Sequence, residues 1–342
     1  MTLHQHQDAP GEDRTGIMLL MKATELIATP EVKVERLHNV EHIHHYDASP
    51  STITIDSISS HCSLPESKLD HLLFMERSIP PIRPIYTENQ PYMTTRSRSM
   101  LVCRMISLHY NFQLLPETLS LAVNILDRVL TKRSVVMENE LELIGVTSLL
   151  ISSKFHDTYQ ELQHQKLVDY LMKGKMCHKF HTSQKKVTHT ENDVIKMERD
   201  ILTRVDYRIS VPTAYTFLYM FLDATGGLAN HRDIIQDASF ILDSTLVIDH
   251  LLEYLPSEIA SGSIVIARMA NGSAPWSEDF ATYTTYSTED VMPIARSILS
   301  TISHMKDTLD LRWIDAKYGR LNSSKISKMQ ELYSYTQGGV IA

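Results

Sequence analysis

Lys154 and Glu198 are charged residues within otherwise apolar segments of this sequence. Such a pair has two interpretations. It is either a solvated salt bridge between neighbouring helices, worth about 0–1 kcal/mol, or a charged anchor that sets the register of a partner bound to an apolar surface. The apolar residues that would surround such an anchor are Ile151, Phe155, Leu202 and Ile209. Both interpretations require two helices that lie side by side.

The sequence carries no recognisable catalytic motif. It has no Gly-rich phosphate loop, no nucleophile elbow and no paired-carboxylate pattern. Histidines and a cysteine gather in two segments, at His38, His42, His44 and His45 and at Cys177, His178 and His181. Neither group has the spacing of a closed zinc site. We therefore expect no metal, no cofactor and no enzymatic activity.

The composition is that of an ordinary globular protein with an acidic excess. Of 342 residues, 43% are hydrophobic and 22% are charged, and the formal net charge is −8. Nucleic-acid-binding proteins usually carry a basic surface, so no nucleic-acid partner is expected. No apolar run reaches the roughly 18 residues of a membrane span, and the opening residues do not resemble a signal peptide. Three widely spaced cysteines suit a reducing compartment, and we expect the nucleus and cytoplasm.

The elements that position the charged pair are predicted to be helices. Residues 141–155 are apolar nearly all round, which is typical of a central buried helix. Small residues that would let neighbouring helices approach it closely are Gly145, Ser148 and Ser152. Other helical stripes are expected at 100–108, 119–130, 194–205, 213–222, 233–248, 257–270, 288–303 and 308–318. Few segments alternate with a period of two, so the fold is predicted to be all-α.

The region before these helices has a different character. Residues 1–65 show little periodicity and are rich in His, Ser, Thr and Pro, which predicts a disordered arm. Residues 68–76 form a short amphipathic segment, and the proline-rich stretch 79–91 predicts extended chain.

The two halves of the helical region are related by a shift of 115 residues. This shift aligns residues 148–151, Ser-Leu-Leu-Ile, with residues 263–266, Ser-Ile-Val-Ile. It also aligns the apolar stripe at 119–126 with that at 234–241. The pattern indicates two copies of one helical unit. Lys154 falls opposite Met269, so the second copy lacks the lysine.

Several segments match the pattern of one known family. Residues 98–130 resemble the first part of a cyclin box, and Ser-Ser-Lys-Phe (152–155) and Val-Ile-Lys-Met-Glu (194–198) resemble its kinase-contacting signatures. Pro-Tyr-Met (91–93) is similar to the entry of A- and B-type cyclins. Downstream segments similar to the second cyclin fold are 211–218, 253–260 and 317–318. The resemblance covers about residues 68–330 and is strongest to mitotic B-type cyclins.

The resemblance implies two tandem five-helix cyclin folds preceded by a short N-terminal helix and a disordered arm. The implied divisions are the arm (1–65), the N-terminal helix and linker (66–96), the N-terminal cyclin box (97–210), the C-terminal cyclin fold (211–330) and a tail (331–342). The interval between Lys154 and Glu198 is longer than is usual in the family. We place the extra residues in the polar loop 173–190, where an insertion costs little stability.

The resemblance also implies a function without chemistry of its own. The chain would bind and activate a cyclin-dependent Ser/Thr kinase and control cell-cycle progression at G2/M. By analogy, it would hold the kinase αC helix inward, where the glutamate of that helix pairs with the ATP-positioning lysine. Residues implied in kinase binding are Lys154, Glu198, Phe155, Ile151, Leu202, Tyr207 and Ile209. Kinase substrates and inhibitors are further implied partners, whereas nucleic acid and membrane are not.

Two further sites follow from the resemblance. Arg98 and Asp127 correspond to a structural salt bridge between the first two helices, which we favour over a direct binding role. The family's substrate-docking patch usually begins Met-Arg-x-Ile-Leu and carries a tryptophan three positions after the leucine. The corresponding patch residues here are Arg98, Met100, Leu101 and Arg104, with Arg104 in place of the tryptophan. Leucine-motif substrates bury apolar side chains on this patch, so Arg104 is expected to weaken their docking.

Other functional classes stay open from the sequence. One is a transcription-factor-like interaction protein that uses a double cyclin fold without binding a kinase. Such proteins tend to be basic on the binding face, and this interpretation leaves Lys154 and Glu198 unexplained. Another is a helical enzyme, for which no catalytic constellation is present. Within the cyclin family, a meiotic or otherwise specialised member stays open because the docking patch diverges and the arm carries no Arg-x-x-Leu degradation box.

Overall fold

The computed structural model is all-helical over the residues that it describes. These are 64–79, 94–132, 136, 138–157, 161–172, 189–308, 317–318, 327–328 and 331–332. Residues 1–63 of the predicted arm, residues 80–91 of the proline-rich stretch and residues 173–188 of the polar loop lie outside them, as do both histidine-rich segments. The described residues from Lys68 onward belong to one compact unit. The prediction of an all-α fold is confirmed.

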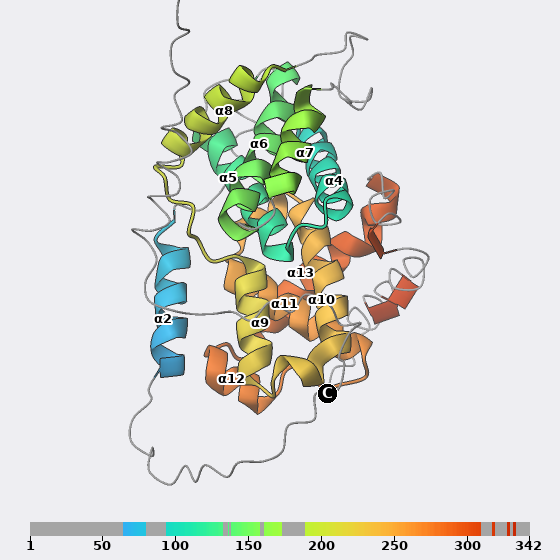
Figure 1. Ribbon diagram of the computed structural model, residues 1–342. Coiled ribbons are helices and arrows are strands. Elements are labelled where there is room, and N and C mark those ends of the chain that lie inside the picture. Colours follow the sequence, from blue (N-terminus) through green and yellow to red (C-terminus); the bar gives the residue numbers. More distant parts are fainter. Residues whose placement is uncertain are drawn as a thin grey trace, which may run out of the picture. The chain divides into compact units, whose positions relative to one another are not determined.

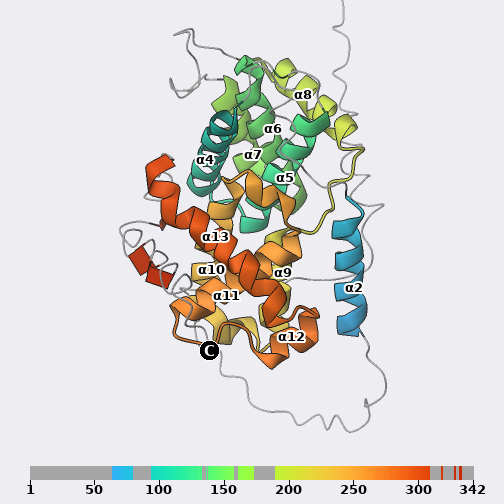
Figure 2. The same cartoon turned by 180° about the vertical axis from the view of Figure 1, so that it is seen from behind.

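Two sets of five helices follow one another along the chain (Figures 1 and 2). The first repeat consists of α4 (Thr95–Asn111), α5 (Pro116–Lys132), α6 (Glu138–His156), α7 (Glu161–Met172) and α8 (Glu191–Arg204). The second consists of α9 (Ala214–Ala224), α10 (Arg232–Leu246), α11 (Pro256–Ala270), α12 (Glu278–Thr284) and α13 (Thr288–Thr308). The helix α2 (Leu64–Arg77) precedes both. This order agrees with the expected short helix followed by two helical repeats.

The 115-residue shift relates helices of the two repeats. It carries α5 almost onto α10 and α6 almost onto α11. In the first repeat α6 packs against α4, α5, α7 and α8, and in the second α11 packs against α9, α10 and α13. Only residues 285–287 separate α12 from α13, whereas residues 173–190 separate α7 from α8. The connection between α7 and α8 is thus the longer of the two, and it is the place where the insertion is predicted.

Small residues bring the central helices close to their neighbours. A Cβ atom on Gly145 of α6 would lie 2.8 Å from a methyl carbon of Leu101 of α4. A Cβ atom on Gly262 of α11 would lie 3.0 Å from a methyl carbon of Ile294 of α13. Both distances are shorter than normal carbon–carbon contacts. The close approach predicted for Gly145 is therefore confirmed.

The sequence did not predict α7 and α12. Only Leu167 and Leu171 of α7 and Phe280 and Thr284 of α12 are buried among the side chains described in these helices. One or two buried positions give no apolar stripe long enough to recognise in a sequence.

The helix α2 is joined to the second repeat by a buried carboxylate. Glu76 is 3% exposed and accepts hydrogen bonds from the backbone N–H (3.0 Å) and the hydroxyl (2.7 Å) of Ser257. Ser257 lies in the first turn of α11, where N–H groups have no partner within the helix. The N-cap residue, Leu255, offers no side-chain acceptor. Glu76 therefore satisfies the start of a helix far from it in the sequence, although burial raises its pKa.

His109 is a buried histidine near the end of α4. It is 4% exposed, and its Nε2 lies 2.9 Å from the carbonyl oxygen of Leu115, so this nitrogen carries the donated proton. Burial lowers the pKa of His109 from about 6.5 to about 3. The ring is therefore neutral at physiological pH.

We predict that His109 makes the fold sensitive to acid. In the unfolded chain it takes up a proton near pH 6.5, whereas the folded state resists protonation down to about pH 3. The free energy of unfolding should therefore decrease as the pH falls through this range, by up to about 1.4 kcal/mol per pH unit. In urea titrations between pH 7 and pH 4, His109→Gln should show a shallower decrease than the wild type. His71→Gln, at an exposed position on α2, is the control, and equal slopes for wild type and His109→Gln would contradict the prediction.

Candidate functional site

Lys154 and Glu198 form an ion pair between α6 and α8. The Nζ of Lys154 donates to the Oε1 of Glu198 at 2.6 Å, and the side chains are 22% and 16% exposed. Lys154 lies in the last turn of α6, where a cation is favoured by the helix dipole. The side chains thus meet in the way that either sequence interpretation requires. Their small but finite exposure leaves both within reach of a partner.

Capping interactions fix both helices that carry the pair. The side chain of Thr190 accepts the N–H of Asp193, and the carboxylate of Asp193 accepts the N–H of Thr190, which sets the start of α8. Beyond the end of α6, the carboxylate of Asp157 accepts the hydroxyl of Thr118 (2.7 Å) and the N–H of Leu115 (3.3 Å). Asp157 therefore ties the end of α6 to the start of α5.

The predicted apolar surroundings of the pair are only partly at the surface. Leu202 and Ile209 are 7% and 8% exposed, Phe155 is half-buried and packs edge-to-face on His156, and Tyr207 is 53% exposed. Ile151 has no exposed surface. The prediction that Ile151 is available to a partner is therefore corrected, because this side chain lies in the core.

The structure adds an exposed apolar residue that the sequence reasoning missed. Ile195 of α8 is 46% exposed and lies three residues before Glu198, and hence on the same side of the helix. The buried stripe of α8 consists of Val194, Met197, Ile201 and Leu202. Ile195 lies next to this stripe and not within it, and this position in the sequence could have predicted its exposure. From here on, the name kinase-facing surface stands for the surface that the resemblance predicts to face a kinase, with Ile195 added; its residues are Ile195, Lys154, Glu198, Leu202, Tyr207 and Ile209.

Arg98 and Asp127 form the expected ion pair in the interior. The Nε and Nη2 of Arg98 each donate to one carboxylate oxygen of Asp127 at 2.7 Å, and neither side chain is exposed. The sequence did not predict that Arg98 also reaches the second repeat. Its Nη1 donates to the carbonyl oxygen of Leu246 (3.1 Å), and the hydroxyl of Ser99 donates to that of Val247 (2.9 Å). These carbonyls lie at the end of α10, so the first repeat satisfies a helix end of the second.

Two of the four residues of the predicted substrate-docking patch lie in the interior. Arg98 and Leu101 have no exposed surface, whereas Met100 and Arg104 are half-buried. The patch prediction is therefore corrected for Arg98, which is held by Asp127, and for Leu101, which packs against Gly145. Met100 and Arg104 stay as predicted patch residues.

Arg104 belongs to a polar network. Its Nε and Nη2 both donate to the hydroxyl of Tyr170, the former at 2.8 Å, and its guanidinium carbon lies 5.0 Å from the centre of the Tyr170 ring. The same hydroxyl donates to the carboxylate of Glu142 at 2.9 Å, and Glu142 is 4% exposed. Arg104 of α4 therefore lies over the ring of Tyr170 and is hydrogen-bonded to this residue of α7.

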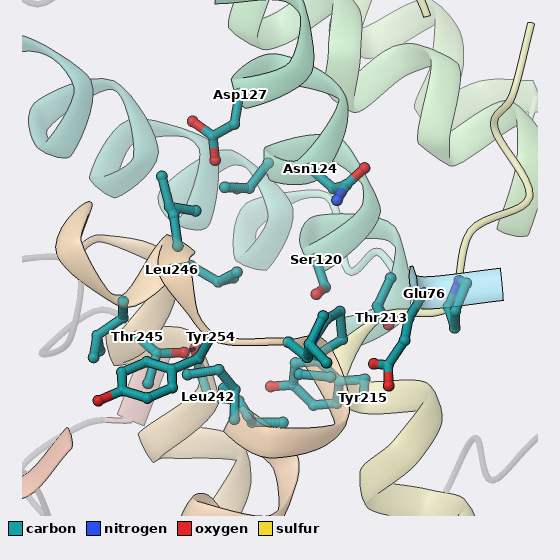
Figure 3. Close-up of a pocket in the computed structure, with 18 of the residues that line it drawn as sticks. Glu76, Ser120, Asn124, Asp127, Thr213, Tyr215, Leu242, Thr245, Leu246 and Tyr254 are labelled. Atoms are coloured by element: carbon teal, nitrogen blue, oxygen red, sulfur yellow. Dashed lines mark hydrogen bonds between the residues drawn. The ribbon is translucent and has the colours of Figure 1, made fainter. Parts of the chain in front are cut away.

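A cavity of about 150 Å³ lies where α5 meets the second repeat. Figure 3 shows Ser120 and Asn124 of α5 on one side and Tyr215 and Leu242 of α9 and α10 on the other. None of the residues that line it belongs to the kinase-facing surface. The cavity is a feature of the junction between the repeats and is separate from that surface.

Family comparisons identify both repeats. Residues 68–210 match the family model "Cyclin, N-terminal domain", and residues 212–332 match "Cyclin, C-terminal domain". The chain belongs to the cyclin family. A solved structure of a viral cyclin from herpesvirus saimiri has the same fold, with a TM-score of 0.56 at 22% identity over 67% of this chain and 96% of the viral one.

Individual relatives of this cyclin are mitotic cyclins. It is 31% identical to G2/mitotic-specific cyclin S13-7 of Glycine max over 68% of this chain and 83% of that protein. It is 30% identical to G2/mitotic-specific cyclin-3 of Saccharomyces cerevisiae and 32% identical to G2/mitotic-specific cyclin-B of Dictyostelium discoideum. These matches span 53% and 49% of the two relatives, about half the length of each. The resemblance to B-type cyclins is thus confirmed.

Within the described part of this cyclin, no three His, Cys, Asp or Glu side chains are grouped to hold a metal ion. None of its described helices is both long and apolar enough to cross a membrane.

The buried pair Arg98–Asp127 yields a stability prediction. Asp127→Asn removes the charge that compensates Arg98 in the interior, so the free energy of unfolding should decrease by about 3–5 kcal/mol. Asp206→Asn alters the exposed ion pair with Lys132 (2.6 Å) and is the control, for which little change is expected. Urea denaturation followed by circular dichroism measures both, and equal effects of the two variants would contradict the central role of Arg98.

Proposed function

We propose that this cyclin is a regulatory subunit that binds and activates a cyclin-dependent Ser/Thr kinase during G2/M progression, in the nucleus and cytoplasm. The observation that carries the proposal is the Lys154–Glu198 pair, which is partly exposed and lies on the same side of α8 as the exposed side chain of Ile195. The second repeat has Met269 where the first has Lys154. The fold therefore does not require the lysine, which favours a binding role.

The geometry of the pair suits a partner that offers polar backbone groups. An ammonium group has three N–H donors, and Lys154 directs one of them to Glu198. The carboxylate of Glu198 has capacity for further acceptance. A kinase segment laid on the surface could hydrogen-bond to both groups while the pair stays intact. The mutual bond would hold both side chains in place before binding, which reduces the entropy lost on association.

Activation would then follow from selective binding. The kinase αC helix moves between an outward and an inward position, and only the inward one brings its glutamate to the ATP-positioning lysine. A cyclin surface that contacts the inward position alone stabilises it by the difference in binding free energy between the two states. This cyclin would supply no catalytic group of its own.

Substrate recruitment through the predicted patch would be weak. The Arg104–Tyr170–Glu142 network places charged and hydroxyl groups at a position one helical turn from Met100 on α4. A leucine side chain that docked there would have to cover these groups, and covering them without new hydrogen bonds is costly. Substrates with more polar motifs would be disfavoured less.

The kinase-binding proposal is tested with Lys154→Ala combined with Glu198→Ala. This double variant should lose kinase co-purification and kinase activation, because both polar anchors are gone, while its thermal midpoint stays close to that of the wild type. The matched control is Asp200→Ala combined with Arg204→Ala, which removes another ion pair of α8 (2.9 Å) outside the kinase-facing surface. Kinase activation by the Lys154/Glu198 variant at the wild-type level would overturn the proposal.

Substrate docking is tested with Arg104→Trp combined with Glu142→Gln. The tryptophan supplies an apolar surface, and the glutamine avoids leaving a buried charge beside Tyr170. Phosphorylation of a peptide that carries a leucine docking motif should increase several-fold. The same peptide with alanine in place of the motif leucine should show no increase. An unchanged rate for the leucine peptide would count against the assignment of Arg104.

A further inference from the structure

The turn that follows α8 has an unusual backbone. Asp206 and Tyr207 both have φ of +55°, in the left-handed region, although neither is glycine. For residues with a Cβ atom this conformation costs roughly 1–2 kcal/mol each. Two such residues in succession persist only where the surroundings determine them strongly.

The surroundings that determine this turn centre on Arg128 of α5. Its Nη2 donates to the carbonyl oxygen of Val205 (2.9 Å), and its Nη1 donates to that of Arg208 (2.7 Å). These carbonyls lie immediately before and after the two left-handed residues. The guanidinium therefore holds the turn at both of its ends.

Arg128 is a costly residue for this position. It is 8% exposed and forms no ion pair among the described residues. Asp206 attracts the guanidinium electrostatically without forming an ion pair with it, and burial still lowers the pKa of Arg128. An apolar side chain would fill the same space at a lower desolvation cost. The geometry that Arg128 imposes on the turn explains its presence better than stability does.

The consequence of this geometry is the outward position of Tyr207. Its backbone N–H is bonded to the carbonyl oxygen of Leu202 (2.9 Å), while its side chain is 53% exposed. By contrast, the side chain of Ile209, two residues later in the sequence, is buried. A change in the turn would redirect Tyr207 without altering Lys154 or Glu198.

We propose that Arg128 is a positioning residue for partner binding, which sets Tyr207 at the edge of the kinase-facing surface. This inference rests on the proposed kinase-binding function. Arg128 itself contacts no partner. It acts by holding the Val205 and Arg208 carbonyls, so that the left-handed turn is already formed before the kinase arrives.

The experiment measures the affinity for the recombinant mitotic cyclin-dependent kinase of Saccharomyces cerevisiae by biolayer interferometry. Arg128→Gln should weaken binding about tenfold, because the turn is no longer held in one conformation. Arg128→Lys, which keeps the charge but cannot reach both carbonyls in the same geometry, should have an intermediate effect. Lys132→Ala removes only the exposed ion pair to Asp206 and is the control, with less than a twofold change expected.

Three double variants separate positioning from a general loss of stability. In the Tyr207→Ala background, Arg128→Gln should have little further effect, because its effect passes through Tyr207. In the Lys154→Ala background it should keep its full tenfold effect. Adding Asp206→Gly to Arg128→Gln should restore part of the affinity, since glycine adopts the left-handed conformation without the steric cost. Thermal melts identify any variant that is not folded at the assay temperature, and Arg128→Lys then takes its place.

The outcomes distinguish this inference from the proposed function. If the wild type binds the kinase and Arg128→Gln binds it with the same affinity, the positioning role is overturned and kinase binding is left intact. The same holds for Arg128→Lys where that variant replaces Arg128→Gln. The positioning role would also be overturned if the Arg128 substitution weakened binding equally in the Tyr207→Ala background and in the wild-type background. Absence of binding by the wild type would contradict the proposed function, and the inference with it.

Discussion

The arrangement of the two repeats depends on the interactions of one buried group, the guanidinium of Arg98. It is paired with Asp127 inside the first repeat and also donates to Leu246 at the end of α10 in the second. Neither charge of the pair reaches solvent, so removal of one partner would leave the other buried and uncompensated. Ser99 supports the same junction through Val247. The main effect of the pair is to constrain how α4, α5 and α10 pack, rather than to add net stability. Any other arrangement of these helices would leave a buried charge without its partner.

The two repeats share a fold but differ in what they present. In both, a small residue on the central helix allows a neighbour to approach, Gly145 in α6 and Gly262 in α11. The first repeat adds Lys154 near the end of its central helix, where the second has Met269. The second instead receives α2 through Glu76 at the start of α11. The same helical unit thus presents a partly exposed ion pair in one copy and attaches the preceding helix in the other.

Much of the fold could be predicted because the helices that matter most are long and strongly patterned. The central helix α6, the repeat and the meeting of Lys154 with Glu198 all followed from apolar spacing and from the resemblance to cyclins. Burial within the site could not be predicted, since spacing does not reveal that Ile151 and Leu101 face the core rather than a partner. The role of Arg128 was also hidden, because its acceptors are backbone carbonyls far along the chain. Such contacts leave no mark on residue type or spacing.

The most direct test of the central claim is hydrogen–deuterium exchange of this cyclin with and without its kinase, read by mass spectrometry. If the kinase-facing surface is the binding site, peptides covering the end of α6 and residues 195–209 should gain protection in the complex. Peptides from the start of α10, where Arg232, Asp233 and Gln236 are exposed, should exchange as before and serve as the internal reference. Protection confined to the second repeat or to α4, with residues 195–209 unchanged in a saturated complex, would contradict the account.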